Sequence, residues 1–287
     1  MKVRFLGVRG STPTPGLSTV RYGGNTVCVE VHLADGTPLI LDAGTGLREL
    51  GNLLMSEGHR QTGGPLHMLL THLHWDHIMG IPFFKPIWHK ETRLQIYPLA
   101  NEVQQAAGRT RALFDGIHFP VRAADVPATI EFLETVASPW RIGSATITRI
   151  GLNHPGGAQG FRIDDDGGAS LCYLTDNELS PPGPPATSLD ALAKFAEGAS
   201  LVIHDAQYTE SEMPQKRGWG HSAIEDVLRL GQKAATKHLV LFHHDPERDD
   251  DAIDATVARG SSWLAENAPG TLLTAAREGV VLDLGGR

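Results

Sequence analysis

The stretch Thr71-His72-Leu73-His74-Trp75-Asp76-His77 decides the fold of this chain. It places three imidazoles and one carboxylate within six residues. The preceding run Pro65–Leu70 is short and mostly apolar, which is typical of a buried strand. We therefore expect the histidines to emerge at the end of a strand, at the edge of a sheet.

The spacing of these side chains favours metal binding. On extended backbone, alternate side chains point the same way, so His72 and His74 can share one metal. If the chain then turns into a helix, Asp76 and His77 can reach a second metal beside the first. Imidazole suits zinc, iron and manganese, and a carboxylate adds charge and a hard oxygen. Three unrelated histidines would rarely show this spacing directly after an apolar strand.

THLHWDH resembles the metal-binding motif of the metallo-β-lactamase superfamily. The resemblance implies an α/β fold, a four-layer αββα sandwich with the site at one edge of its two sheets. It also implies two divalent metal ions, zinc first and manganese or iron as alternatives, held by about seven protein ligands.

The composition is that of an ordinary soluble globular protein. The 287 residues are 41% hydrophobic and 20% charged. The net charge of −8 counts against long RNA or DNA as a partner. We find no signal peptide and no apolar run long enough to span a bilayer, so we expect a cytoplasmic protein without a membrane partner. Cys28 and Cys172 lie in apolar stretches and are expected to be buried free thiols.

Strands dominate the first two thirds of the chain, and strands alternate with helices afterwards. The expected strands are Lys2–Val8, Thr26–Leu33, Pro38–Leu41, Pro65–Leu70, Leu94–Tyr97, Ala128–Leu133, Ala145–Ile150, Gly160–Ile163, Ser170–Thr175, Leu201–Ile203, His238–Phe242, Thr271–Thr274 and Val280–Leu284. The expected helices are Leu47–Met55, Asn101–Phe114, Leu189–Glu197, His221–Gln232 and Pro246–Glu266. No repeat or low-complexity linker divides the chain, so we expect one hydrolase domain over residues 1–287.

Three further ligand candidates each follow an expected strand: His154, Asp176 and His243. The superfamily pattern implies one metal held by His72, His74 and His154, another held by Asp76, His77 and His243, and Asp176 bridging the two. His244 competes with His243, which we prefer because it comes first after its strand. His154 as a turn residue and Asp176 as a solvated carboxylate remain the alternatives.

Ligands need supporting contacts. Asp42, at a strand end, is our candidate to hold a ligand histidine, and the alternative is a cap for the helix that begins at Leu47.

Several blocks resemble the ribonuclease Z and phosphodiesterase branch of the superfamily: the opening FLGVRGSTPTPG, LILDAGTG, THLHWDHIMGIPFF and LTDNE. His204–Tyr208 and Gly220–Ala223 are similar to its two proton-transfer loops. Carried over, His221 is the general acid and Asp205 its orienting carboxylate, and with the ligand Asp76 they form the implied catalytic set. Asp205 stands where the branch has Glu, whose side chain is one methylene longer. The alternative for His221 is a residue of the cap region at the start of a helix.

Two departures from ribonuclease Z bear on the substrate. That enzyme carries a long tRNA-gripping arm between its third metal histidine and the bridging aspartate. Here the interval from His154 to Asp176 has room only for a hairpin of two strands, which argues against tRNA 3′ processing. Trp75 stands where ribonuclease Z usually has glycine, and it either narrows the approach to the metals or packs under the loop.

The sequence thus favours a dinuclear phosphodiesterase that cleaves small phosphodiesters, for instance cyclic nucleotides, with a hydroxide shared by the metals. The alternatives are a ribonuclease Z-like tRNA 3′ endonuclease, a lactone or thioester hydrolase, and a non-catalytic metal-binding relative. A homodimer stays open. Phe83, Phe84 and Trp88 either wall the substrate pocket or pack the core. Three residues of the first long loop either contact phosphate or are ordinary loop residues: Arg9, Arg21 and Asn25.

Overall fold

The computed structural model describes residues 1–56, 64–99, 102–134 and 138–285, and their strands form two sheets. One sheet has the order β14 (Val281–Asp283), β1 (Lys2–Gly7), β2 (Cys28–His32), β3 (Pro38–Leu41), β4 (Leu66–Leu69), β5 (Arg93–Tyr97) and β6 (Thr129–Phe132). The other has the order β13 (Leu272–Ala275), β12 (His238–Phe242), β11 (Leu201–Asp205), β10 (Ser170–Leu174), β9 (Ala158–Asp165), β8 (Ala145–Leu152) and β7 (Trp140–Ile142).

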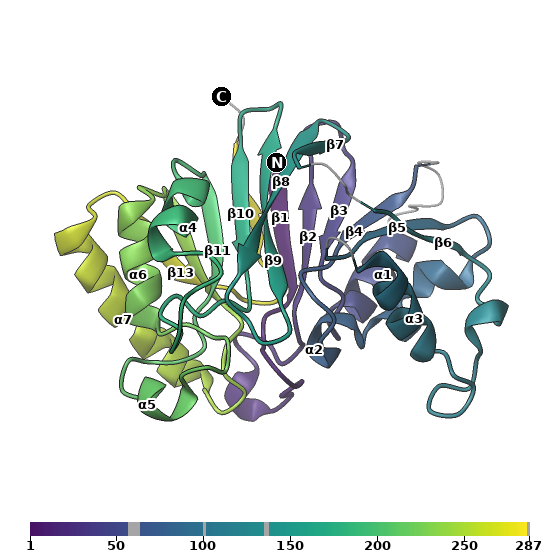
Figure 1. Cartoon of the computed structure of the whole chain (residues 1–287), viewed down its shortest axis with the longest axis horizontal. Coiled ribbons are helices and arrows are strands. Elements are labelled where there is room, and N and C mark those ends of the chain that lie inside the picture. The colour runs from purple at the N-terminus through teal and green to yellow at the C-terminus, as the bar shows by residue number, and fades with distance from the viewer. Residues whose placement is uncertain (57–63, 100–101, 135–137, 286–287) are drawn as a thin grey trace.

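Helices flank the two sheets on their outer sides (Figure 1). Beside the first sheet lie α1 (Leu47–Ser56), α2 (Trp75–Ile78) and α3 (Val103–Ala112), and beside the second lie α4 (Leu189–Ala196), α6 (Ile224–Lys233) and α7 (Asp250–Asn267). The short helix α5 (Met213–Lys216) and 3₁₀ turns at Leu17–Thr19, Ile81–Phe83, Lys85–Trp88 and Ala123–Asp125 lie in the loops. The expected αββα sandwich is confirmed.

Alternating apolar side chains build these layers. In β12, Val240 and Phe242 pack between the sheets, while Leu239 and Leu241 pack against the outer helices. Successive side chains of a strand point to opposite faces, so a strand covered on both sides needs a continuous apolar run. On the other flank, Leu47 and Leu50 of α1 lie at helical spacing and pack on the first sheet.

Parallel strands determine where functional residues can gather. Strands β3 to β6 run parallel to one another, and so do β10 to β13. The loops after the carboxyl ends of parallel strands meet at one edge of a sheet, which is the usual ligand-binding edge of such folds. The loops after β3, β4, β10, β11 and β12 carry most of the residues singled out above.

Some expected boundaries were wrong. The helix expected from His221 begins at Ile224, because Ala223 before it is extended and His221 is held by its contact with Asp205. The helix expected from Pro246 begins at Asp250, because the carboxylate of Asp249 accepts a hydrogen bond from the backbone N–H of Ala252 (2.8 Å) and caps it there. Strand β7 was not predicted. The expected helix start at Asn101 lies outside the described residues.

Two further expectations can be compared with the structure. Cys28 and Cys172 are buried free cysteines, as expected. Within the described part of the chain, no helix is both long and apolar enough to cross a bilayer.

Candidate metal centre

Three residues of the site adopt an uncommon backbone conformation within two residues of the ends of their strands. Asp42, Asp176 and His243 have φ values of 58°, 57° and 58°. Residues other than glycine rarely adopt this left-handed conformation, and such strained positions cluster at functional sites. Here the sharp turn lies at the carboxyl ends of β3, β10 and β12, where it brings each side chain to the edge of its sheet.

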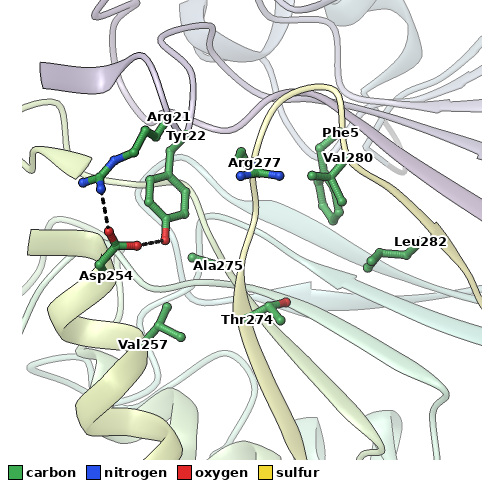
Figure 2. A pocket seen from close by; sticks show the side chains of 10 residues that line it. All are labelled: Phe5, Arg21, Tyr22, Asp254, Val257, Thr274, Ala275, Arg277, Val280 and Leu282. Atoms are coloured by element: carbon green, nitrogen blue, oxygen red, sulfur yellow. Dashed lines mark hydrogen bonds and ion pairs between the residues drawn. The ribbon is translucent and has the colours of Figure 1, made fainter. Parts of the chain in front are cut away.

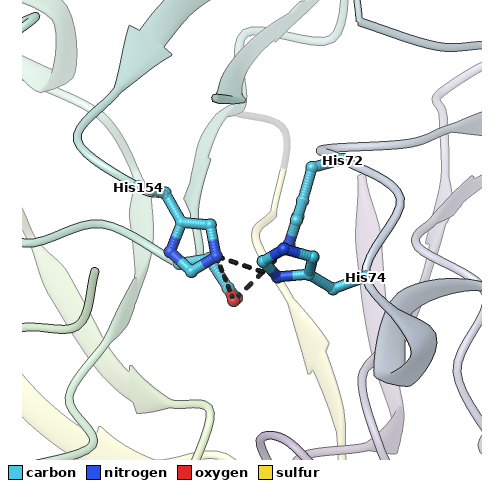
Figure 3. A group of neighbouring side chains, drawn as sticks. His72, His74 and His154 are labelled. Carbon is cyan, nitrogen blue, oxygen red and sulfur yellow. Dashed lines mark hydrogen bonds and ion pairs between the residues drawn. The ribbon is translucent and has the colours of Figure 1, made fainter. Parts of the chain in front are cut away.

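The first group of ligand-type side chains joins loops from both sheets. It contains His72, His74, His154 and Asp176, whose ligand atoms all lie within 4.8 Å of one another. Nε2 of His154 is 3.1 Å from Nδ1 of His74. The three imidazoles converge on a carboxylate oxygen in Figure 3, and Oδ2 of Asp176 is 3.6 Å from Nε2 of both His72 and His154.

The second group shares the same aspartate. Asp76, His77, Asp176 and His243 also have ligand atoms within 4.8 Å of one another. Oδ1 of Asp176 is 3.1 Å from Nε2 of His77 and 3.1 Å from Nε2 of His243. Oδ2 of Asp76 is 3.4 Å and 3.3 Å from the same two nitrogens. Asp176 therefore turns one oxygen toward each group.

The outward nitrogens of four histidines are already engaged. Nδ1 of His154 is 3.0 Å from the carbonyl oxygen of Gly220, which can only accept, so this nitrogen carries a proton. Nδ1 of His77 is 3.0 Å from the carboxylate of Asp42. The remaining two outward contacts, each of 3.0 Å, run from Nδ1 of His72 to Oγ1 of Thr71 and from Nδ1 of His243 to Oε1 of Gln207.

This pattern leaves Nε2 of these rings facing inward, as metal-binding histidines require. Nε2 of His72 and Nε2 of His77 are buried and make no well-aligned hydrogen bond to any residue that the structure describes, although oxygens of Asp176 lie 3.6 Å and 3.1 Å from them. Buried nitrogens without a hydrogen-bond partner are costly unless something else satisfies them. The donor set of imidazoles and carboxylates therefore fits divalent metal.

The charges of the two groups differ. Burial lowers the pKa of His72, His74 and His154, which favours neutral rings. Burial would raise the pKa of Asp176, but His243 and His77 outweigh it and hold that pKa well below its usual range. Burial likewise opposes the charge of His77, yet Asp176 and Asp76 raise its pKa well above the usual value. Neutral imidazole and ionised carboxylate are the forms that bind metal.

A histidine–aspartate pair lies against this centre. Nδ1 of His221 is 2.5 Å from Oδ2 of Asp205, so the shorter carboxylate does reach the ring. The imidazole of His221 stacks on that of His243, with ring centroids 5.0 Å apart, and lies 5.3 Å from the ring of His154. Burial lowers the pKa of His221, but Asp205, with help from Asp176, raises it to about 9.

Comparison with known proteins identifies the family. Residues 37–244 match the family described as the beta-lactamase superfamily domain. The chain belongs to this superfamily. Ribonuclease Z of Haloarcula marismortui is 25% identical to it over 293 residues, covering 85% of this chain and 86% of the relative.

Solved structures share the metallo-β-lactamase fold of this chain. The metallo-β-lactamase fold protein YhfI of Bacillus subtilis has a TM-score of 0.69 at 21% identity and covers 98% of both chains. A diphosphatase of the PhnP family has a TM-score of 0.67 at 19% identity, covering 98% of this chain and 97% of that one. The chain is thus a metallo-β-lactamase-fold protein of the hydrolase type, in the ribonuclease Z and phosphodiesterase branch of a superfamily that uses divalent metals.

Of two adjacent histidines, the superfamily fold brings His243 into the centre. The neighbouring His244 points elsewhere, and its Nε2 is 2.9 Å from the carbonyl oxygen of Ala276. Burial lowers the pKa of His244 to about 3, so it stays a neutral structural residue.

For the first loop, the structure favours the alternative of ordinary loop residues over phosphate contacts. Arg9 is fully buried and donates to the backbone carbonyls of Gly23 (2.9 Å), Asp245 (3.1 Å) and Arg248 (2.5 Å). It therefore ties the first loop to the loop after β12.

The other two residues, Arg21 and Asn25, pair with carboxylates of the protein. Arg21 pairs with Asp254 at 3.0 Å, beside a cavity of about 320 Å³ at the edges of β13 and β14 (Figure 2). Tyr22 donates to the same carboxylate at 2.6 Å. The side-chain amide of Asn25 donates to Glu278 (2.9 Å).

The aromatic residues after the motif divide between core and surface. Phe84 is fully buried in the core under α1, and Trp88 stacks on Phe119 with centroids 6.0 Å apart. Trp75 and Phe83 are 68% and 55% exposed, and they line a cavity of about 670 Å³.

Sequence reasoning missed the supporting residues other than Asp42, whose carboxylate contacts the candidate ligand His77 as expected. Tyr173 and Thr71 also hydrogen-bond to Asp42. Glu178 is buried and accepts from the backbone N–H groups of Gly218 and Gly220, which fixes the loop that carries His221. The only signal was its place in the LTDNE block.

Proposed function

We propose that this protein is a phosphodiesterase that hydrolyses small phosphodiesters, for instance cyclic nucleotides, at a pair of divalent metals. The observation that carries the proposal is the His221–Asp205 pair, which stacks directly on His243 of the ligand groups. A phosphodiester with an alkoxide leaving group needs both charge neutralisation and a proton donor, and this site offers residues for each.

Seven side chains would hold the metals: His72, His74, Asp76, His77, His154, Asp176 and His243. The opposed oxygens of Asp176 support two ions rather than one. The dominance of imidazole favours zinc, with manganese or iron as alternatives. When bound, such ions supply positive charge that stabilises the negative charge developing on the phosphoryl oxygens, and they make water more acidic.

His221 would act as the general acid. Its Nδ1 is engaged by Asp205, so Nε2 is the atom from which a proton can pass to the departing oxygen. Asp205 fixes the ring and stabilises its protonated form. The Oδ1 of Asp205 accepts from the backbone N–H of Gln207 (3.1 Å), which holds the carboxylate in place.

A ribonuclease Z-like tRNA 3′ endonuclease is the second candidate, favoured by the ribonuclease Z relative. Two features support a small substrate instead. Between His154 and Asp176 the chain forms only the hairpin of β9 and β10, without room for a tRNA-gripping arm. The net charge of −8 also disfavours a polyanion.

Hydrolysis by metal-loaded protein tests the proposal. The panel contains bis(p-nitrophenyl) phosphate, cyclic nucleotides, a lactone, a thioester and a tRNA precursor. We expect turnover of the phosphodiesters, loss of turnover with a chelator, and recovery on adding metal. A highest kcat/KM on the lactone, the thioester or the tRNA precursor would contradict the proposal.

A further inference from the structure

A cavity of about 670 Å³ adjoins the metal-binding motif. Its size lies within the range of small-ligand sites in proteins, roughly 300–1,000 Å³. It lies among α2, the Ile81–Phe83 turn, α3 and the segment that follows α3. Its lining residues are Leu73, Trp75, Ile78, Met79, Pro82, Phe83, Arg109, Ala112, Leu113, Asp115, His118 and Phe119.

Ligand residues and cavity residues alternate along the motif. Leu73 lies between His72 and His74, and Trp75 lies between His74 and Asp76. Consecutive Cα atoms are about 3.8 Å apart, so the cavity wall begins one residue from the metal ligands. The two sets of residues interleave on one short segment, which makes the cavity and the ligand groups neighbours in the fold.

The wall of the cavity is aromatic, and part of its apolar surface is exposed to solvent. Trp75 and Phe83 expose 68% and 55% of their surfaces, although both are large apolar residues. Phe119 packs edge-on against Phe83, with centroids 5.6 Å apart, and stacks on Trp88 behind it. The cavity thus offers fixed aromatic faces beside Trp75, and exposed apolar patches of this kind mark binding sites.

The rim of the cavity is polar. Arg109, Asp115 and His118 supply donors and acceptors there. The carboxylate of Asp115 accepts from the backbone N–H groups of Ile117 and His118, both at 2.8 Å, and pairs with the ring of His118 at 2.5 Å. These bonds fix the rim. Aromatic faces with polar groups at the edge match a heterocycle better than an alkyl chain, which has no edge to hydrogen-bond.

We infer that this cavity binds the planar heterocyclic base of the phosphodiester substrate, with Trp75 and Phe83 as the stacking residues. The inference rests on the proposed function and narrows its substrate class to nucleotide-like phosphodiesters. It makes Trp75 and Phe83 determinants of specificity that hold the organic group while the reacting phosphate lies at the ligand groups.

Binding of two matched probes tests the base directly. Adenosine 5′-phosphate and ribose 5-phosphate share the sugar and the phosphate and differ only in the base. Calorimetry on the metal-loaded protein should show tighter binding of adenosine 5′-phosphate. Base–aromatic stacking predicts a preference of roughly 5- to 150-fold.

The variants identify the stacking residues. Trp75→Ala and Phe83→Ala should each remove most of the preference while leaving the affinity for ribose 5-phosphate within about twofold, since neither side chain is buried. Trp75→Phe should retain most of the preference. Ile117→Ala is the matched control, because Ile117 is 84% exposed on the same loop as Phe119 and does not line the cavity.

Several outcomes overturn the inference. They are equal affinity of the wild type for the two probes, an unchanged preference in Trp75→Ala and Phe83→Ala, and tighter binding of decyl phosphate with the same dependence on Trp75. A dimer that dissociates in both alanine variants would assign the cavity to a second copy of the chain. These results differ from a failure of the proposed function, which would appear as an intact base preference without hydrolysis of any phosphodiester.

Discussion

Asp176 explains why two groups of ligands can form one centre. Its Oδ2 faces His72 and His154, and its Oδ1 faces His77 and His243. The carboxylate is buried, and the neighbouring imidazoles of His243 and His77 favour its charged form. A buried charge needs partners of opposite sign, so this geometry favours bound cations on both sides.

The role of His221 depends on the leaving group. His221→Ala should lower kcat on cyclic nucleotides by about 10²–10⁴-fold, because their alkoxide leaves poorly without a proton. The loss on bis(p-nitrophenyl) phosphate should be much smaller, because nitrophenolate leaves unaided. Steady-state kinetics on both substrates provides the measurement.

The control for this variant is its metal content, which should equal that of the wild type, since His221 is not among the seven ligands proposed here. Asp205→Asn should show the same dependence on the leaving group with a smaller loss. Equal losses on the two substrates would remove the general-acid role.

At single residues, the sequence predicted the candidate ligands, which depend on spacing along the chain. It missed the residues that support them, which depend on contacts between distant segments. The spacing of the HxHxDH motif indicates candidate ligands, and a candidate that follows an apolar strand is easy to place. Gln207 and Tyr173 contact His243 and Asp42 only because strands far apart in the sequence lie side by side. The sequence left the role of Arg9 open between a phosphate contact and a loop residue, because nothing in its sequence neighbourhood reveals the carbonyls to which it donates.

At the scale of the elements, two loop glycines lie so close to the candidate ligands His243 and His154 that a side chain would collide with the rings. A Cβ on Gly10 would lie 2.3 Å from Nδ1 of His243, and one on Gly220 would lie 2.2 Å from Nδ1 of His154. Gly220 also has a φ of +87°, which disfavours other residues. The loop before β2 therefore packs against the group that contains His243, and the loop before α6 packs against the group that contains His154.

Each substitution should weaken a different metal. Gly10→Ala should displace His243 and weaken the ion beside Asp76, and Gly220→Ala should displace His154 and weaken the ion beside His74. Loss of supporting geometry typically costs about 10–100-fold in metal affinity. Competition with a chelating dye measures both affinities.

Matched controls come from the same loops. Gly16 has no atom within 4 Å of an added Cβ, so Gly16→Ala should bind metal normally. Gly218 has a φ of +88° but only ordinary contacts, so Gly218→Ala separates backbone strain from the clash. Loss of the same metal in Gly10→Ala and Gly220→Ala would contradict the division into two groups.

The periodicity of the sequence predicted most helices and strands, but it did not predict the short strand β7. β12 and β10 carry apolar runs whose two faces both pack, which is a strong signal for a buried strand. β7 has only three residues, too few for any period to show, and it exists because it pairs with β8.

At the scale of the whole molecule, the centre joins the two sheets. The HxHxDH ligands follow β4 of one sheet, while His154, Asp176 and His243 follow strands of the other. Metal at this place would link the two sheets as well as support catalysis. Anything that binds only the folded chain stabilises it, so metal binding and folding stability should rise together.

Metal content measured by mass spectrometry, together with thermal unfolding, tests the central claim most directly. We predict two equivalents of divalent metal per chain in the wild type and about one in His154→Ala. Asp176→Ala should bind both metals more weakly, because it faces both groups, and chelation should lower the unfolding temperature of the wild type. At most one equivalent in the saturated wild type, or unchanged binding of both metals in Asp176→Ala, would contradict the account.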